Sequence, residues 1–214
     1  MSRVIVSCFS VSIDGFGAGP GQSLDNPLGV GGMRLHDWVF PLAAWREPQG
    51  LAGGEVSAST PVIEASRADI GAIIMGRNMF GGGPGPWGDD PWNGWWGDNP
   101  PYHHPVFVLT HHPREPLVCE GGTTFTFVTD GIESALGQAS AAAAGGDVSL
   151  AGGAHAARQY LAADLVDEMT INLVPIFLGD GERLFDNLGA GNPALTQVDS
   201  VTAPGVTHLT FRRT

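Results

Sequence analysis

A short apolar run meets two glycines in the C-terminal half of the chain, and a helix-forming stretch follows at once. Residues 148–151 are the apolar run, Gly152 and Gly153 come next, and Ala154 and His155 begin the stretch. This order predicts a strand, a tight turn and a helix. The turn would expose backbone N–H groups beside the positive end of a helix dipole, which suits a pyrophosphate. A plain sharp turn is the alternative interpretation.

Two other apolar runs also end in residues that can bind an anion. Gly76 and Arg77 follow residues 70–75 and offer backbone amides and a guanidinium, and Thr110 and His111 end the run that starts at residue 105. The carboxyl ends of parallel strands meet at one edge of an open α/β sheet, where ligands bind. The three strand ends together therefore predict a nucleotide cleft.

Several common sites are absent from the sequence. All basic residues are arginine, so lysine Schiff bases and the P-loop lysine are excluded. The glycines at 15, 17, 19 and 21 have the wrong spacing for the G-x-G-x-x-G fingerprint, and no G-x-S-x-G nucleophile motif occurs. We expect no metal site, because the neighbouring imidazoles of His111 and His112 would point to opposite faces of a strand.

Composition limits the class of protein and its partners. The chain has 214 residues, 43% of them hydrophobic, which supports a single domain over 1–214 with a full core. The formal charge of −12 argues against nucleic acid and against anionic membranes as partners. There is no apolar run long enough to span a membrane and no secretory signal at the start, so we expect a cytoplasmic protein.

Short apolar strands alternate with helical stretches along most of the chain. This alternation predicts an α/β fold in three layers around a mostly parallel central sheet. The last two apolar runs, 166–174 and 206–212, have no helix between them. We therefore expect an antiparallel edge at the C-terminal side of the sheet.

The substrate side is predicted from two aromatic segments. Residues 81–104 form a long loop rich in glycine, proline and tryptophan, which is either a packed surface loop or subunit contact, or a wall of the substrate pocket. Within a short helix near 35–40, Asp37 lies beside Trp38 and Phe40. A carboxylate desolvated there would have a raised pKa and could donate a proton. Alternatively, Asp37 lies on the surface or pairs with a neighbouring arginine.

The sequence resembles the dihydrofolate reductase superfamily, and within it the stand-alone relatives of the reductase domain that ends the bifunctional riboflavin-biosynthesis deaminase-reductase. The matching pieces run in the family's order over nearly the whole chain: Ser12-Ile13-Asp14-Gly15, Ile74 to Phe80, Val108-Leu109-Thr110, Gly152-Gly153, Leu165 to Glu168, and Pro175 to Phe185. Each piece is weak alone, but the ordered set is specific for the fold.

The resemblance implies a reductase that binds NADPH. Gly76 and Arg77 would lie by the cofactor phosphates, and Thr110 and His111 near the adenosine 2′-phosphate. The pyrophosphate would bind at the joint of residues 152–155. His111 stands where the family often has arginine, so NADH is also possible, and Met79 replaces a frequent threonine. We expect a homodimer.

The resemblance also implies a closing loop and a substrate class. Asp14 would begin the loop that closes over the nicotinamide and is the second candidate for a catalytic carboxylate, with a plain Asp-Gly turn as the alternative. We expect Trp38, Phe40 and Trp87 to contact the substrate. That substrate would be a small heterocycle or a riboflavin precursor, as for a 5-amino-6-(5-phosphoribosylamino)uracil reductase, although few basic residues are present to hold a phosphate.

Two other functions fit the sequence. One is a nucleotide- or ligand-binding protein that keeps the fold without turnover, and the other is an oligomer that binds a flavin or heterocycle.

Overall fold

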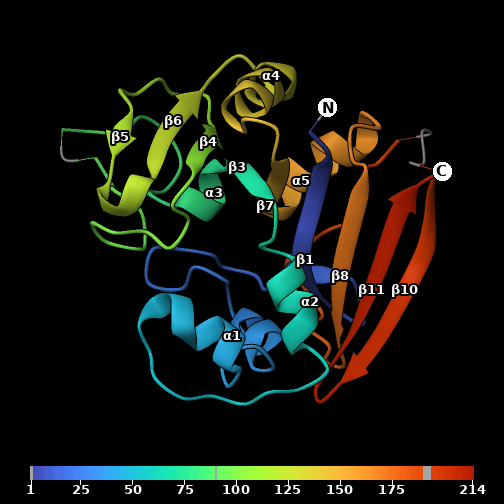
Figure 1. Ribbon diagram of the computed structural model, residues 1–214. Coiled ribbons are helices and arrows are strands. Elements are labelled where there is room, and N and C mark those ends of the chain that lie inside the picture. The colour runs from blue at the N-terminus through green and yellow to red at the C-terminus, as the bar shows by residue number, and fades with distance from the viewer. Residues whose placement is uncertain (1, 90, 190–193) are drawn as a thin grey trace.

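The computed structural model describes residues 2–89, 91–189 and 194–214 and shows an α/β fold built on a nine-stranded sheet (Figure 1). The strands lie in the order β10-β11-β8-β1-β7-β3-β4-β6-β5. Six neighbouring strands are parallel and form the centre: β8 (Glu168–Val174), β1 (Val4–Ser12), β7 (Asp147–Gly152), β3 (Ile70–Gly76), β4 (Pro105–Leu109) and β6 (Thr124–Val128). The mostly parallel sheet predicted from the sequence is confirmed.

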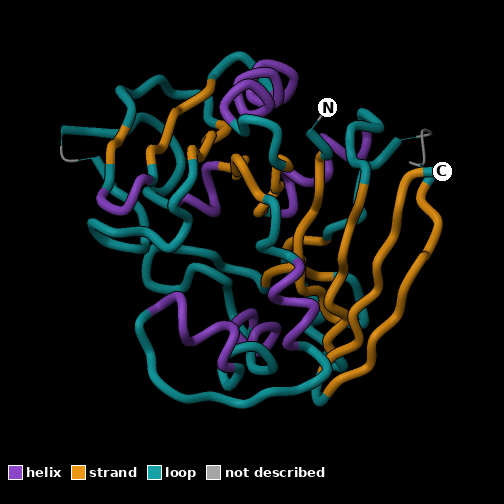
Figure 2. Tube along the Cα trace, viewed as in Figure 1, coloured by secondary structure: helices purple, strands orange, loops and turns teal. Residues whose placement is uncertain are grey.

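Antiparallel strands complete the sheet at both sides. At the C-terminal side, β11 (Val206–Arg213) pairs with β8 and β10 (Leu195–Ala203) pairs with β11, which confirms the predicted antiparallel edge. The short β5 (Leu117–Val118) pairs with β6 at the opposite edge. A separate two-stranded ribbon joins β2 (Phe16–Ala18) to β9 (Glu182–Arg183); Figure 2 shows all strands in orange.

Different elements pack on the two faces of the sheet, and successive side chains of a strand point to opposite faces. On β3, Ile74 packs into a core formed with α4 (Ile132–Ala142) and α5 (Ala154–Ala162). Its neighbour Met75 packs on the other face with α3 (Arg77–Phe80) and the tryptophan loop 81–104. The sheet therefore lies between two layers, one formed by α4 and α5 and the other by α3 and the tryptophan loop, which confirms the three-layer prediction.

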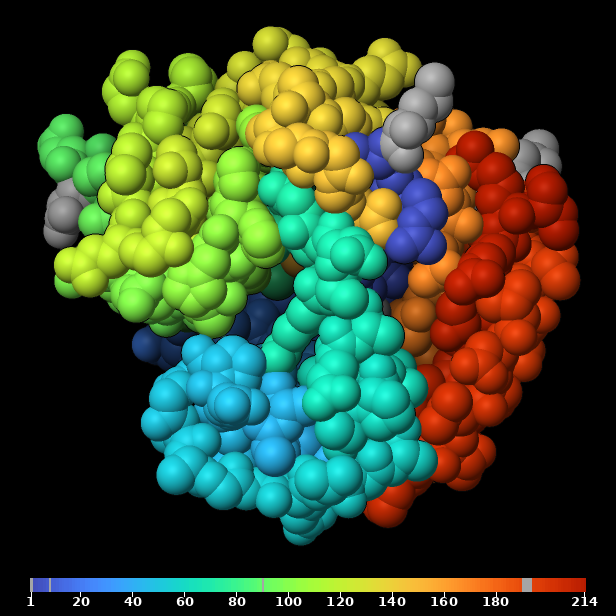
Figure 3. Space-filling model, in the orientation of Figure 1, coloured from blue at the N-terminus to red at the C-terminus, as the bar shows by residue number. Residues whose placement is uncertain are grey.

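A third apolar cluster lies below the C-terminal end of β8 and the N-terminal start of β11. It includes side chains of the short helical segments η1 (Gly32–His36), α1 (Ala43–Arg46) and α2 (Thr60–Ala65), and η2 (Glu47–Gln49) follows α1 without a buried residue. One further 3₁₀ turn, η3 (Glu120–Gly122), lies between β5 and β6. In Figure 3 the light-blue and cyan residues of the N-terminal third form the lower surface, beside the red C-terminal hairpin.

A buried polar chain ties this cluster to the sheet. His208 on β11 lies directly opposite Asn172 on β8, and its Nδ1 is 2.7 Å from Asn172 Oδ1. Its Nε2 is 2.8 Å from Ser59 Oγ, and the ring of Trp38 meets the imidazole edge-on at 5.0 Å. Burial lowers the pKa of His208, so the imidazole is neutral in this chain of hydrogen bonds.

This burial predicts a stability that depends on pH. The folded-state pKa of His208 lies below the unfolded-state value near 6.5, so its stabilising effect is complete above about pH 6.5. As the pH falls further, the unfolded chain binds the proton first, and we expect the free energy of unfolding to drop by up to about 1.4 kcal/mol per pH unit for this group.

Urea unfolding between pH 7.5 and 5 measures the slope. The His208→Asn protein should have a lower stability at pH 7.5 and a flatter pH dependence. Replacement of the exposed His111 by Asn is the matched control and should leave the slope unchanged. An unchanged slope in His208→Asn would contradict the prediction.

Candidate active site

A cleft of about 690 Å³ lies across the carboxyl ends of β1, β7, β3, β4 and β6. All eight residues that the sequence assigned to the cofactor line this cleft: Gly76, Arg77, Thr110, His111, Gly152, Gly153, Ala154 and His155. The parallel strands bring these residues together, because each group follows the C-terminal end of one strand. The prediction that the three strand ends share one cleft is confirmed.

The N-terminus of α5 forms an open cradle in the cleft. Gly153 is its N-cap residue, with φ −73° and ψ −173°, and a Cβ atom added there would meet nothing within 4 Å. The first-turn N–H groups of a helix have no acceptor inside the helix, so those after Gly153 are available to a ligand. This open backbone, at the positive end of a helix dipole, fits a pyrophosphate.

A second helix starts at the same cleft. Gly131 is the N-cap of α4 and lines the cleft with Thr129 and Ile132. A Cβ atom at Gly131 would also meet nothing within 4 Å. This joint was not predicted from the sequence, although residues 124–132 repeat the order of strand, glycine and helix found at Gly152 and Gly153.

Arg77 lines the cleft, but its guanidinium is engaged by the tryptophan loop. Its Nε donates to the carbonyl of Gly81 at 3.0 Å and its Nη2 to that of Gly82 at 3.3 Å. Its Cζ lies 3.1 Å from the ring centre of Trp87. Burial lowers the pKa of Arg77, and the charge of Arg114 lowers it further. These contacts hold the loop, and a contact between Arg77 and a phosphate stays a prediction.

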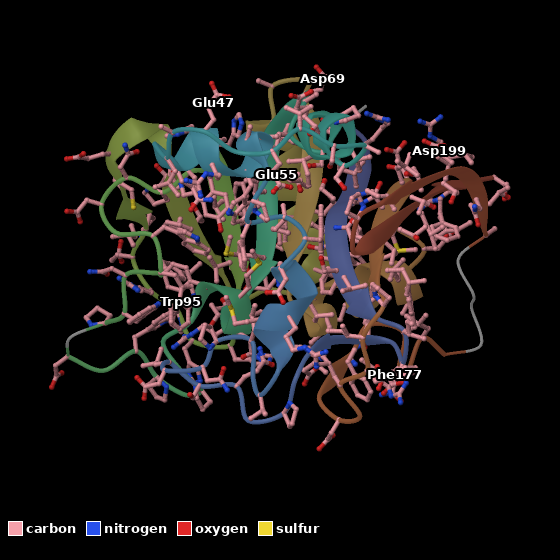
Figure 4. All side chains as sticks on the ribbon, turned by 90° about the horizontal axis from the view of Figure 1, so that it is seen from below. Glu47, Glu55, Asp69, Trp95, Phe177 and Asp199 are labelled. Carbon is pink, nitrogen blue, oxygen red and sulfur yellow. The ribbon has the colours of Figure 1, made fainter. Side chains whose placement is uncertain are left out.

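The tryptophan loop is packed, and part of it is also a wall of the cleft. Trp95 and Trp96 line the cleft, and the indole of Trp95 donates to the carbonyl of Met79 at 2.9 Å. In Figure 4, Trp95 lies at the side of the sheet opposite Asp69, which precedes β3. Gly81 makes this packing possible, because its φ is +91° and a Cβ atom there would be 2.8 Å from both Trp92 and Trp95.

Trp87 is not among the residues that line the cleft, so the structure does not bring it to the predicted substrate contact. Its ring packs edge-on against Phe80 and Phe127, and its Nε1 donates to the carbonyl of His112 at 2.9 Å. Together with the guanidinium of Arg77 on its face, these contacts partly bury the indole against the apolar cluster of β3, β4 and β6.

The structure does not bring Asp37, Trp38 and Phe40 to the cleft either, because none of them is among its lining residues. The segment is not a regular helix. The 3₁₀ helix η1 ends at His36, and Asp37 in the following turn is exposed, so it is not desolvated. Trp38 is buried and donates from Nε1 to the Leu35 carbonyl at 3.0 Å. The ring of Phe40 stacks on the ring of His36.

Asp14 does not line the cleft and fastens a turn instead. Its carboxylate accepts hydrogen bonds from Ser12 Oγ at 2.5 Å, Leu178 N at 3.2 Å and Gly179 N at 2.8 Å. The hydrogen bond from Ser12, with those from the backbone, lowers the pKa of Asp14. A lowered pKa keeps the group ionised, which is the opposite of what a proton donor needs.

The N-terminal segment supplies lining residues that sequence reasoning missed. His36, one position before the predicted Asp37, lines the cleft, as do Phe9 and Ser10 from β1. The ring of Phe9 lies over Gly17, where a Cβ atom would be 2.6 Å from Phe9 Cε1. The segment is irregular, so its sequence pattern does not show whether His36 or Asp37 faces the cleft. The tertiary structure is needed to decide this.

The family model of the RibD C-terminal domain matches residues 3–209. The chain belongs to this family. Its fold is that of the riboflavin-pathway reductase domains, as the resemblance implied. No curated protein sequence matches the chain.

Solved structures of the RibD type share the whole fold at low sequence identity. A putative riboflavin biosynthesis protein from Shewanella sp. PV-4 has a TM-score of 0.62 and 22% identity, covering 100% of this chain and 99% of its own. RibD of Acinetobacter baumannii has a TM-score of 0.60 and 16% identity. A Thermotoga maritima diaminohydroxyphosphoribosylaminopyrimidine deaminase/5-amino-6-(5-phosphoribosylamino)uracil reductase has a TM-score of 0.56 and 12% identity. The matches cover 100% of this chain, but only 58% of the Acinetobacter protein and 57% of the Thermotoga protein.

Among residues 2–89, 91–189 and 194–214, no three His, Cys, Asp or Glu side chains are grouped so as to hold a metal ion. In the same part of the chain, no helix combines the length and hydrophobicity needed to cross a bilayer.

Proposed function

We propose that this chain is an NAD(P)H-dependent reductase that transfers a hydride to a small, uncharged planar substrate. The observation that carries the proposal is the open cradle at Gly153, where the first turn of α5 faces a cleft already lined by Gly76 and Thr110. The bound cofactor would supply the hydride. The chain's own part is to hold its phosphates with backbone N–H groups and to exclude water.

The charges around the cleft favour a substrate without a phosphate. Among the lining residues that the structure describes, Arg77 and Glu182 are the two that belong to the Asp, Glu, Lys and Arg types. The guanidinium of Arg77 is held by the Gly81 and Gly82 carbonyls, and Glu182 lies 3.5 Å from Arg158. A substrate phosphate would therefore meet one arginine, whose Nε and Nη2 are already engaged and whose Nη1 is buried without a hydrogen-bond partner.

A phosphoribosyl substrate like that named for the Thermotoga protein is thus not the one we propose. The flat side chains of Trp95 and Trp96 favour an uncharged ring instead. The homodimer expected from the sequence, and the preference for NADPH over NADH, stay predictions.

A non-catalytic nucleotide-binding protein is the second candidate. The observation that favours it is that neither predicted acid, Asp37 or Asp14, lines the cleft. Such a protein would bind the cofactor through the same cradle and leave it unoxidised.

One pair of assays tests both candidates. Titration of NADPH and NADH, followed by tryptophan fluorescence, should give saturable binding. Loss of absorbance at 340 nm should then follow addition of uncharged heterocycles or carbonyl compounds, and a phosphoribosylated heterocycle should react more slowly. Binding without oxidation across a broad panel would favour the second candidate, and no binding of either cofactor would contradict both.

A further inference from the structure

The tryptophan loop contains the one Asn-Gly pair of the sequence, Asn93-Gly94. A glycine has no Cβ atom, so its backbone nitrogen is open to the side-chain carbonyl carbon of the preceding asparagine. The N–H of Gly94 forms no hydrogen bond with any residue that the structure describes, and Asn93 is exposed to water. The pair therefore offers the nucleophile, the amide and the water that a deamidation needs.

The guanidinium of Arg114 is fixed against the amide of Asn93. Its Nη2 donates to Asn93 Oδ1 at 2.6 Å, and its Nη1 donates to the carbonyl of the preceding residue, Trp92. Its Cζ also lies 4.9 Å from the ring centres of Trp87 and Phe127, which hold it in place. When a nitrogen attacks the amide carbon, negative charge develops on Oδ1, and a fixed guanidinium stabilises that charge.

We propose that Asn93 is a site of spontaneous deamidation that Arg114 accelerates. The nitrogen of Gly94 bonds to Cγ of Asn93, and the bond from Cγ to Nδ2 breaks. Nδ2 takes up the proton of the Gly94 nitrogen and leaves as ammonia, which gives a cyclic imide. One water molecule then opens the imide, to aspartate if it attacks the side-chain carbonyl formed from Cγ's partner bond to Gly94, or to isoaspartate if it attacks the backbone carbonyl.

The pair is the whole link between two anchored tryptophans. The indole of Trp92 donates to the carbonyl of Phe80, and that of Trp95 donates to the carbonyl of Met79, each at 2.9 Å. The two rings also meet edge-on, with their centres 4.7 Å apart. Both ends of the link are therefore held, and Trp95 is at the same time a wall of the cleft.

The two products act differently on this wall. Isoaspartate adds one carbon atom to the main chain, about 1.5 Å of bond length, between the two anchored rings. The longer link displaces one of the indoles from its carbonyl. Aspartate keeps the length of the chain and places a carboxylate against Arg114, which leaves the loop at least as stable as before.

Ageing of the purified protein at pH 8 and 37 °C tests the reaction. Fragment mass spectrometry should show the replacement of –NH₂ by –OH at Asn93, and an isoaspartate methyltransferase should label the same fragment. Asn99 is the internal control, because it is exposed in the same loop but precedes Pro100, whose nitrogen has no hydrogen and cannot form the imide. Asn93→Gln should remain unmodified, because its longer side chain does not form the five-membered imide.

Two further variants separate the role of Arg114 from that of the added charge. Arg114→Met keeps an apolar stem beside Trp87 and should slow the reaction about three- to tenfold, the effect of one hydrogen bond. Asn93→Asp carries the new charge without the longer chain. Its urea midpoint should equal or exceed that of the wild type, and its indole N–H groups should keep their protection against hydrogen exchange.

The isoaspartate fraction, separated by ion exchange, should behave differently from Asn93→Asp. The indole N–H of Trp92 or Trp95 should exchange with solvent about tenfold faster, as the loss of one hydrogen bond allows, and the urea midpoint should fall.

Three results would overturn the inference: no faster ageing at Asn93 than at Asn99, an unchanged rate in a folded Arg114→Met protein, or an isoaspartate fraction in which both indoles keep their protection. The inference does not rest on the proposed function. None of these assays involves a cofactor or substrate, so a failure here and a failure of the reductase proposal are recognised separately.

Discussion

The Gly153→Asp protein should lose at least a hundredfold in NADPH affinity while keeping the stability of the wild type. The new carboxylate would stand in the open space before the first turn of α5, where we place the pyrophosphate. Two like charges about 4 Å apart repel by about 4 kcal/mol at an effective dielectric constant of 20, which exceeds the free energy of a hundredfold change.

The fold should tolerate this change for reasons local to Gly153. Its φ of −73° is open to any residue, and a Cβ atom there has no neighbour within 4 Å. Aspartate is also a favoured N-cap residue, whose side chain accepts hydrogen bonds from first-turn N–H groups. Thermal unfolding should therefore give a midpoint equal to or above that of the wild type.

Two variants control for charge and for the loss of glycine. Gly137→Asp adds the same charge to an exposed position of α4, again with nothing within 4 Å, and should bind NADPH like the wild type. Gly153→Ala should lose far less affinity than Gly153→Asp. Tight NADPH binding by a folded Gly153→Asp protein would remove the pyrophosphate from this joint.

The Arg77→Ala protein should be less stable than the wild type by about 3–4 kcal/mol. The side chain makes two hydrogen bonds to the carbonyls of Gly81 and Gly82 and stacks on Trp87. A neutral hydrogen bond contributes about 1 kcal/mol and a partly desolvated cation–π contact about 1–2 kcal/mol. Urea unfolding with and without the substitution measures the difference.

The same protein separates two roles of Arg77. If the guanidinium acts by holding the tryptophan loop, NADPH and NADH affinities should fall by the same factor. Arg77→Lys should not restore stability, because an ammonium cannot reproduce the planar fork over Trp87 and towards two carbonyls. A loss confined to NADPH, with unchanged stability, would instead place the guanidinium on the 2′-phosphate.

The cofactor side of the cleft was predictable because its signals are local. Each apolar run that ends in glycine or a small polar residue is visible over fewer than ten residues, and parallel topology then brings the ends together. The joint at Gly131 carried the same signal and was overlooked. The open Cβ positions at Gly131 and Gly153 required the structure, since they depend on neighbours far along the chain.

The substrate side was not predictable, because its segments have no regular period. His36 lines the cleft, whereas Asp37, the next residue in the chain, is exposed. No regular period in this segment distinguishes the two positions. Trp38 is buried by contact with His208, which is distant in sequence. Trp87 packs outside the cleft against Arg77, Phe80 of α3 and Phe127 of β6. Such long-range packing leaves no pattern in the sequence around each residue.

A crystal structure of the protein with bound NADPH tests the central claim most directly. The account predicts pyrophosphate oxygens within hydrogen-bond distance of the N–H groups at the start of α5, with the adenosine end towards Thr110 and His111. The nicotinamide should lie towards Phe9 on β1. A cofactor bound outside this cleft, or a pyrophosphate with no contact to the joint at Gly152 and Gly153, would contradict it.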